Sequence, residues 1–413
     1  MRSFVPSSTA LNPSTVARSA GFAALAALAA LVALAGCPSA SEPDPTPAPT
    51  PALDSFAADP ERPVPADVRD GPCMDVTLAD LDADGDLDVV IANEGPRNRI
   101  LWNEEGTLRS GPETPRPQTD SEEAWVGDLD GDGVLDVLFA DEDTIDDEWY
   151  RWADGAFADR SDDLPPSDTS NALDVADLDG DGWLDVVMGN GGPNTLWRGS
   201  PQGFMVADDV PVRDETTQDI AIADLNGDGL LDVWSANEGP DAIWLQDADG
   251  SFVDGTAGLP GANVESRQVA LADLDDDGDV DALQGNVGWS GLSRRDRLLL
   301  NDGTGTFTVA TDALPDDQHH TLDVLLVDLD EDGDLDVIRS TVSVGNQGLG
   351  ASPFTAWEND SGEFTDATER WLPGAPEGMG LDAEVGDLDG DGLLDLYLCS
   401  RGGDDQVLYG QGG

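Results

Sequence analysis

One nine-residue pattern of acidic side chains recurs seven times in the chain. Asp or Asn stands at positions one, three, five and nine of every copy, and Gly stands at position six. The copies begin at Asp80, Asp128, Asp177, Asp224, Asp273, Asp328 and Asp387. Oxygen ligands in this number, around a Gly that permits a sharp turn, are those that Ca²⁺ takes from a short loop. The pattern therefore predicts about seven calcium sites, one per copy.

The ligands expected in each copy are the side chains at positions one, three, five and nine and the backbone carbonyl at position seven. Copy by copy, these residues are Asp80, Asp82, Asp84, Asp86 and Asp88; Asp128, Asp130, Asp132, Val134 and Asp136; Asp177, Asp179, Asp181, Trp183 and Asp185; Asp224, Asn226, Asp228, Leu230 and Asp232; Asp273, Asp275, Asp277, Asp279 and Asp281; Asp328, Asp330, Asp332, Asp334 and Asp336; Asp387, Asp389, Asp391, Leu393 and Asp395. Zinc or copper would want imidazole or thiolate, and His319 and His320 are the only histidines. We interpret these two as solvated loop residues rather than as a metal site or a pH sensor.

The elements around each loop are predicted to be strands. An EF-hand shares the first half of the pattern but has a bidentate Glu at position twelve and flanking helices. Position twelve of the first copy is instead Ile91, within the β-like run LDVVIAN, and the other copies continue in the same way. Apolar residues alternate with period two before each loop, which is typical of half-buried strands. Each loop therefore joins two strands.

The spacing of the copies predicts the architecture. Successive copies start 48, 49, 47, 49, 55 and 59 residues apart. A period near 50 residues accommodates one four-stranded propeller blade. We therefore expect an all-β fold, a seven-bladed β-propeller over residues 53–413 with one calcium-binding DxDxDGxxD loop per blade. Trp102, Trp197, Trp244 and Trp357 recur after the hairpins, and we expect them to pack in the core rather than to stack on sugars.

Seven DxDxDGxxD loops in register resemble the FG-GAP/VCBS repeats, which form the propeller of integrin α-subunits and occur in bacterial surface proteins. The resemblance implies a calcium-stabilised scaffold that presents loops to a protein or glycan partner. The chain departs from the integrin pattern because every blade, not a subset, carries a metal loop, and because Asn226 replaces Asp. Thrombospondin-type calcium repeats share the nine residues but are shorter and disulfide-rich.

The charge balance limits the partners and the chemistry. Against 86 acidic residues stand 19 basic ones, a net charge of −67, so nucleic acid is excluded as a partner. The chain contains no Lys, which excludes phosphate-loop nucleotide binding and Schiff-base chemistry. We expect a binding module rather than an enzyme. A polysaccharide lyase or hydrolase built on a propeller stays open as the alternative, and a calcium buffer without a saturable partner is a third interpretation.

The N-terminus has the features of an export signal. Arg2 and Arg18 precede an apolar run that ends in Leu34-Ala35-Gly36-Cys37, which resembles a bacterial lipobox. We expect residues 1–36 to be removed, Cys37 to be lipidated, and residues 37–52 to form a Pro-rich tether. Membrane attachment would then occur only through Cys37, on an outer-membrane or cell-surface lipoprotein of a bacterium. Simple secretion is the alternative.

The last repeat lacks a fourth strand, and an N-terminal segment is expected to supply it. The sequence SFAADPERPVPA near Ser55 matches EFTDATERWLPG near Glu363, so the N-terminal copy would complete the seventh blade and close the ring. Cys73 and Cys399 would then lie on neighbouring blades, in an oxidising compartment where a cysteine pair tends to form a disulfide.

Two insertions predict where a partner binds. They span Asn286–Arg297 and Ser340–Phe354 and would emerge on the face opposite the calcium loops. The first carries Trp289, Arg294, Arg295 and Arg297, residue types that often anchor interfaces. The alternative is that these arginines pair with nearby aspartates such as Asp296 and Asp302. The sequence gives no indication of oligomeric state.

Overall fold

A computed structural model describes residues 16–17, 53–66, 71–117, 120–142, 147–153, 155–167, 169–261, 264–289, 292–316, 319–345, 348–350, 352–374, 377–378, 380–401 and 403–412. The expected signal peptide, apart from residues 16–17, and the expected tether with Cys37 lie outside these ranges. Residues 16–17 form the short strand β1 (Val16–Ala17), which pairs with β23 (His320–Val327). Among the described residues, no helix has the length and apolar character needed to cross a bilayer.

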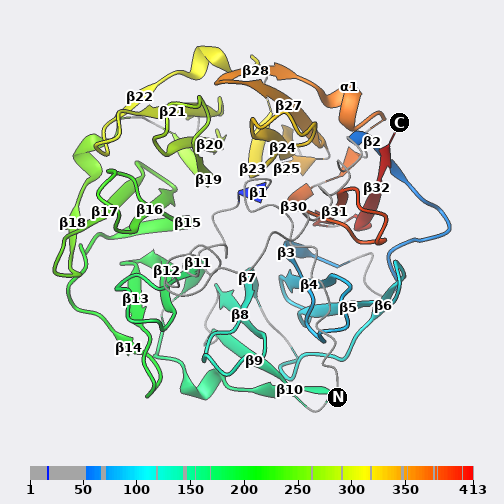
Figure 1. The fold of residues 1–413 in the computed structure, drawn as a ribbon, viewed down its shortest axis with the longest axis horizontal. Helices are drawn as coiled ribbons and strands as arrows, with labels where there is room; N and C mark the ends of the chain where they lie inside the picture. Colours follow the sequence, from blue (N-terminus) through cyan, green and yellow to red (C-terminus); the bar gives the residue numbers. More distant parts are fainter. Residues whose placement is uncertain are drawn as a thin grey trace, which may run out of the picture.

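Antiparallel sheets surround a central axis, so the chain folds as a β-propeller (Figure 1). In chain order the strands from inside to outside are β3 (Cys73–Ala79), β4 (Asp88–Asn93), β5 (Arg99–Asn103) and β6 (Leu108–Ser110); β7 (Ser121–Gly127), β8 (Asp136–Asp141), β9 (Glu148–Ala153) and β10 (Ala156–Asp159); β11 (Ser170–Ala176), β12 (Asp185–Gly192), β13 (Thr195–Arg198) and β14 (Met205–Val206); β15 (Glu215–Ala223), β16 (Asp232–Asn237), β17 (Ala242–Gln246) and β18 (Phe252–Asp254). They continue with β19 (Glu265–Ala272), β20 (Asp281–Val287), β21 (Arg297–Asn301) and β22 (Phe307–Val309); β23, β24 (Asp336–Gly345), β27 (Thr355–Asp360) and β28 (Glu363–Asp366); β30 (Gly380–Gly386), β31 (Asp395–Ser400), β32 (Gln406–Gly412) and β2 (Leu53–Ala58).

The remaining elements are short. β25 (Gly348–Gly350) pairs with β24, and β26 (Ser352–Pro353) pairs with β29 (Glu377–Gly378). Single helical turns follow several outer strands, at Ser161–Asp163, Thr256–Gly258, Thr311–Ala313 and α1 (Thr368–Trp371).

The core lies between neighbouring sheets, because each sheet buries apolar side chains on both faces. One cluster, for example, joins Val187 and Leu196 of one sheet to Ile220, Val233 and Trp244 of the next. The repeated tryptophans belong to this packing, as predicted from their recurrence. Trp197, Trp244 and Trp357 are buried, and Trp102 is half-buried with its ring centroid 4.9 Å from that of Trp152.

The N-terminal segment closes the ring, as its similarity to residues near Glu363 predicted. Strand β2 pairs with β32, with Phe56 opposite Gly410, and becomes the outermost strand of the C-terminal sheet (Figure 1). Phe56 is buried in a cluster with Leu53, Leu408 and Trp371. Sheets from the two ends of the chain therefore lie side by side, and a disulfide joins Cys73 on β3 to Cys399 on β31.

The inner strands are also linked in a circle that the sequence analysis did not predict. In each inner strand, one side-chain oxygen accepts a hydrogen bond from a backbone N–H of the next inner strand. The pairs are Asp75 with Ala124, Glu123 with Leu173, Asp174 with Ile222, Asp219 with Val269, Gln268 with Val324, Asp323 with Ala383 and Asp382 with Val76. The last pair returns to the first inner strand, so the circle is complete.

Candidate calcium sites

Each Asp-rich loop connects the inner strand of a sheet to the second strand. The first loop, for example, follows β3, which ends at Ala79, and leads into β4, which begins at Asp88. The inner strand and the second strand pair along their length, with Ala79 opposite Asp88. The loop is therefore the tip of a rigid hairpin.

The backbone of every loop turns sharply at two positions. Gly at position six has φ between 85° and 107° in all seven loops. Position four also has positive φ, between 58° and 76°, and in three loops it is not Gly but Ala83, Asp276 or Glu331. The turn at position six was predicted from the glycine, whereas the turn at position four was not, because a non-Gly residue rarely adopts this conformation.

Hydrogen bonds within the loop hold the carboxylates of positions one and five. In all seven loops the N–H of the Gly at position six donates to the Asp at position one, over 2.8–3.2 Å. The N–H of position seven likewise donates to the Asp at position five, over 2.9–3.0 Å. Because the same two bonds recur in every copy, the loops share one geometry.

The Asp at position nine is the buried base of the loop. Its side chain is 0–1% exposed in all seven copies, and it accepts the N–H of the Leu at position two over 2.9–3.2 Å. In six copies its other oxygen accepts an N–H from the third strand or just after it, over 2.7–2.9 Å. Burial raises the pKa of Asp88, Asp136, Asp336 and Asp395 to about 7 and that of Asp185, Asp232 and Asp281 to about 6. A bound cation would lower these pKa values again.

The predicted ligand positions converge in several loops. Positions one, three and nine offer oxygens within 4.8 Å of one another in the loops that begin at Asp80, Asp128 and Asp273. Positions one, three and five do so in the loops that begin at Asp177 and Asp328. Carboxylate oxygens alone, without imidazole or thiolate, are the donor set that a hard cation such as Ca²⁺ prefers.

The side chains at position seven have another role. Asp86 accepts the N–H of Glu105 over 2.8 Å, and Asp334 accepts the N–H of Ser361 over 2.9 Å. Both bonds tie the loop to the turn between the two outer strands of the same sheet. The sequence predicted a role at position seven only for the backbone carbonyl, as a metal ligand. In these two loops the carboxylate of position seven also stabilises the loop, by accepting a hydrogen bond from the outer turn.

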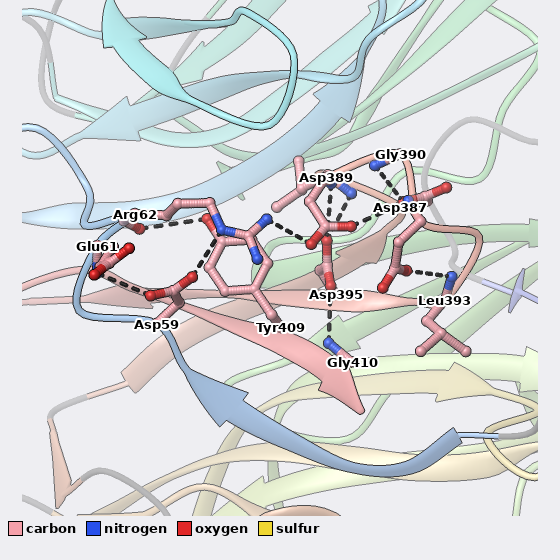
Figure 2. Close-up of polar contacts among 12 residues, drawn as sticks. Asp59, Glu61, Arg62, Asp387, Asp389, Gly390, Leu393, Asp395, Tyr409 and Gly410 are labelled. Atoms are coloured by element: carbon pink, nitrogen blue, oxygen red, sulfur yellow. Dashed lines mark hydrogen bonds and ion pairs between the residues drawn. The ribbon is translucent and has the colours of Figure 1, made fainter. Parts of the chain in front are cut away.

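Arginines that follow the outer strands reach the carboxylate at position three of three loops. Figure 2 shows Arg62, after β2, whose Nη1 lies 2.5 Å from Oδ2 of Asp389 and whose guanidinium lies 4.0 Å from the ring centre of Tyr409. Arg370 lies 3.2 Å from Asp330, and Arg160 lies 3.6 Å from Asp130. These pairs were not predicted from the sequence. Their signal is an Arg shortly after the outer strand, as in DPER and DATER.

The four residues predicted to bind a partner do not form one exposed patch. Trp289 is 40% exposed, and the guanidinium of Arg267 lies 4.4 Å from its ring centre. Arg295 pairs with Asp312 at 3.3 Å, and Arg297 is half-buried and donates to Gln284 and to the carbonyl of Pro260. Both arginines are therefore engaged within the chain.

Two residues of the insertion Asn286–Arg297 contact the neighbouring sheet, which contains β23 and β24. Asp296 forms a buried pair with Arg339, 2.5 Å apart, rather than with the arginines beside it in the sequence. Arg294 lies 3.4 Å from Nε2 of His320. The interpretation of His320 as a solvated loop residue is wrong: it begins β23, is 3% exposed, and its Nδ1 accepts the N–H of Gly288. The strand begins at His320, within the polar sequence that precedes Leu322.

Comparison with known proteins identifies the repeats. The FG-GAP-like repeat pattern matches residues 80–139, 128–188, 177–235, 224–283 and 342–398. No curated protein is detectably similar to the chain in sequence. Among solved structures, BBS1N, determined in complex with ARL6DN, is 14% identical with a TM-score of 0.56, over 88% of this chain and 97% of that one.

Two other solved structures are less similar. The extracellular domain of BT4673 from B. thetaiotaomicron is 11% identical, with a TM-score of 0.48, over 87% of this chain and 38% of that one. An Agrocybe aegerita lectin that recognises non-reducing terminal N-acetylglucosamine is 18% identical, with a TM-score of 0.44, over 70% of this chain and 78% of that one. At these identities the likeness concerns the fold alone.

Proposed function

The chain belongs to the FG-GAP-like repeat family, and from this premise we propose that it is a calcium-stabilised, seven-bladed extracellular scaffold that binds a protein or glycan ligand. The observation that carries the proposal is the shared loop geometry: the same hydrogen bonds orient the carboxylates at positions one and five in all seven loops. A geometry kept in every copy favours one common ligand, and the donor set favours Ca²⁺.

Charge gives calcium its stabilising effect. The seven loops hold 32 acidic residues in 63 positions, and like charges a few ångströms apart repel one another in a partly buried loop. Seven Ca²⁺ ions would add 14 positive charges to a chain of −67. Metal that binds only the folded state stabilises it by about 2.7 kcal/mol per site at a hundredfold excess over Kd.

Export and lipid attachment are part of the same proposal. The lipobox-like sequence at Cys37 and the Pro-rich residues 37–52 support a lipoprotein tethered at the outer membrane or cell surface. The disulfide between Cys73 and Cys399 supports an oxidising compartment. Metabolic labelling with a fatty acid tests this directly. We expect label on the intact chain and none on the Cys37→Ser variant.

The scaffold role is tested by ligand capture with calcium as the variable. Purified protein is used to pull down surface proteins and glycans in 2 mM Ca²⁺ and in chelator, with a variant that carries Asp→Asn at position one of every loop as the matched control. We expect saturable capture that needs calcium and is lost in the variant. Capture that is equal with and without calcium would contradict the proposal, and so would turnover of a polysaccharide in place of binding.

A further inference from the structure

The inner strands surround a cavity of about 310 Å³ on the axis of the propeller, the lower end of the size range of small-ligand sites. Its lining comes from inner strands all around the ring. The residue six positions before each loop contributes in every sheet, and these residues are Met74, Glu122, Asn171, Gln218, Arg267, Leu322 and Leu381. One sequence position thus supplies a complete ring of side chains to the cavity.

This ring has an apolar side and a polar side. Leu322, Leu381 and Met74 lie on consecutive inner strands, β23, β30 and β3, and form an apolar arc. The polar residues of the ring lie on the other four strands, β7, β11, β15 and β19. A ligand that fills the cavity must therefore offer both apolar and polar surface.

The lining of the cavity carries an excess of negative charge, contributed by carboxylates on both sides of the ring. Nine carboxylates line the cavity against two arginines, and they are Asp75, Glu94, Glu122, Glu123, Glu142, Asp219, Glu238, Asp323 and Asp382. Both arginines are already paired, Arg401 with Glu94 and Arg267 with Glu238 at 3.7 Å and with Glu265 at 3.3 Å. Burial and the neighbouring Glu142 raise the pKa of Glu122 to about 8, so this carboxyl is ionised at neutral pH only when a cation lies beside it. The field inside the cavity excludes anions and attracts cations.

Asn171, which lines the cavity, carries an unsatisfied hydrogen-bond acceptor. Asn171 is 7% exposed and lines the cavity, and its Nδ2 donates to the carbonyl of Thr217 over 2.9 Å. Its Oδ1 is buried and accepts no hydrogen bond from the described part of the chain. A buried acceptor without a partner destabilises the fold unless a donor from outside satisfies it.

We propose that the axial cavity binds a small aliphatic amine, with its methylene groups against Met74, Leu322 and Leu381 and its ammonium groups toward Glu122 and Asn171. An ammonium group supplies both the positive charge and the donors that this side of the cavity lacks. Calcium fits less well, because it takes only oxygen ligands and would leave the apolar arc without a partner. The proposal goes beyond the calcium scaffold and does not depend on it.

Isothermal titration calorimetry of the full-length, calcium-loaded protein with 1,4-diaminobutane tests the proposal. We expect saturable binding at one site per chain, no binding of the neutral analogue 1,4-butanediol, and binding of ammonium ion that is at least tenfold weaker, because ammonium lacks the methylene groups. Equal binding of the diol or of ammonium ion would overturn the proposal, and so would the absence of binding by the diamine.

Two matched variants and one competition locate the site. Glu122→Gln removes the carboxylate that a bound ammonium group would hold in its ionised form, and should weaken diamine binding about tenfold or more. Glu104→Gln makes the same change at a side chain that is 61% exposed outside the cavity and should have no effect. Equal affinities of the two variants would refute the location. Displacement of the diamine by 20 mM Ca²⁺, but not by NaCl of equal ionic strength, would show a metal site and overturn the amine assignment. If Glu122→Gln does not fold, the series of ligands on the unchanged protein decides.

Discussion

Removal of the N-terminal strand should open the propeller, and the structure gives the size of the effect. A chain that starts at Gly71 lacks Leu53, Phe56 and Val64, which are 5%, 2% and 3% exposed. Complete burial of one such side chain contributes about 1.5–3 kcal/mol, so the three together contribute about 5–9 kcal/mol. This is a large part of the 5–15 kcal/mol that usually separates a folded domain from its unfolded state. The loss also exposes the hydrogen-bonding edge of β32, which pairs with β2 in the closed ring.

The assay compares urea unfolding and light scattering of the shortened and full-length proteins in saturating calcium. We expect the shortened protein to unfold at lower urea and to aggregate. A milder version, Phe56→Ala, should lower the free energy of unfolding by about 3–5 kcal/mol because it leaves a cavity in the core. Val253→Ala on β18, where the side chain is 45% exposed, is the control and should change it by less than about 0.5 kcal/mol. Equal stability of the shortened and full-length proteins would refute closure by β2.

Three further predictions concern charge and covalent links. In metal-free buffer the melting temperature should fall as the pH rises from about 5 to about 8. Burial raises the pKa of Glu148 to about 8 and that of Asp405 to about 7, so the folded state binds more protons than the unfolded chain over this pH window. A melting temperature that rises with pH would contradict this. Arg370→Gln should increase the calcium affinity of the loop that contains Asp330, because it removes a positive charge 3.2 Å from an expected ligand oxygen. Arg213→Gln, which removes an arginine paired with Glu215 and Asp254 away from the loops, is the control and should not change it. Equal calcium titrations of the two variants would show that Arg370 does not influence calcium binding. Cys73 and Cys399 should give no titratable thiol in unreduced protein, and labelling of both would exclude the disulfide.

The sequence predicts the local features of the site and the order of the sheets well. The repeated Asp and Gly positions act within nine residues, so their effect on the turn depends little on the rest of the chain. Closure by β2 was also predictable. The sequence near Ser55 is similar to the sequence near Glu363, which supplies the outer strand of its own blade, so the N-terminal segment was expected to supply the missing outer strand of the last blade. Repetition therefore carried information about contacts that are distant in the sequence.

Side-chain contacts between residues far apart in the sequence were not predicted. Arg62 reaches Asp389 across 327 residues, and although an Arg follows several outer strands, its local sequence does not indicate which carboxylate it pairs with. The link from Asp382 to the N–H of Val76 likewise needs the ring to be closed. His320 was assigned to a loop because its neighbours are polar, whereas the pairing of β23 with β24 places it inside a sheet. In each case the partner is set by tertiary structure rather than by local pattern.

Calcium is central to the proposed scaffold, and a direct count of bound ions tests its role most simply. Protein stripped of metal is titrated with Ca²⁺ while bound calcium and the melting temperature are measured on the same samples. The account predicts about seven ions per chain, one for each of the loops that begin at Asp80, Asp128, Asp177, Asp224, Asp273, Asp328 and Asp387, with Kd of about 0.1–1 mM and a melting temperature that rises with occupancy. Binding of no calcium, or an unchanged melting temperature at saturation, would contradict it.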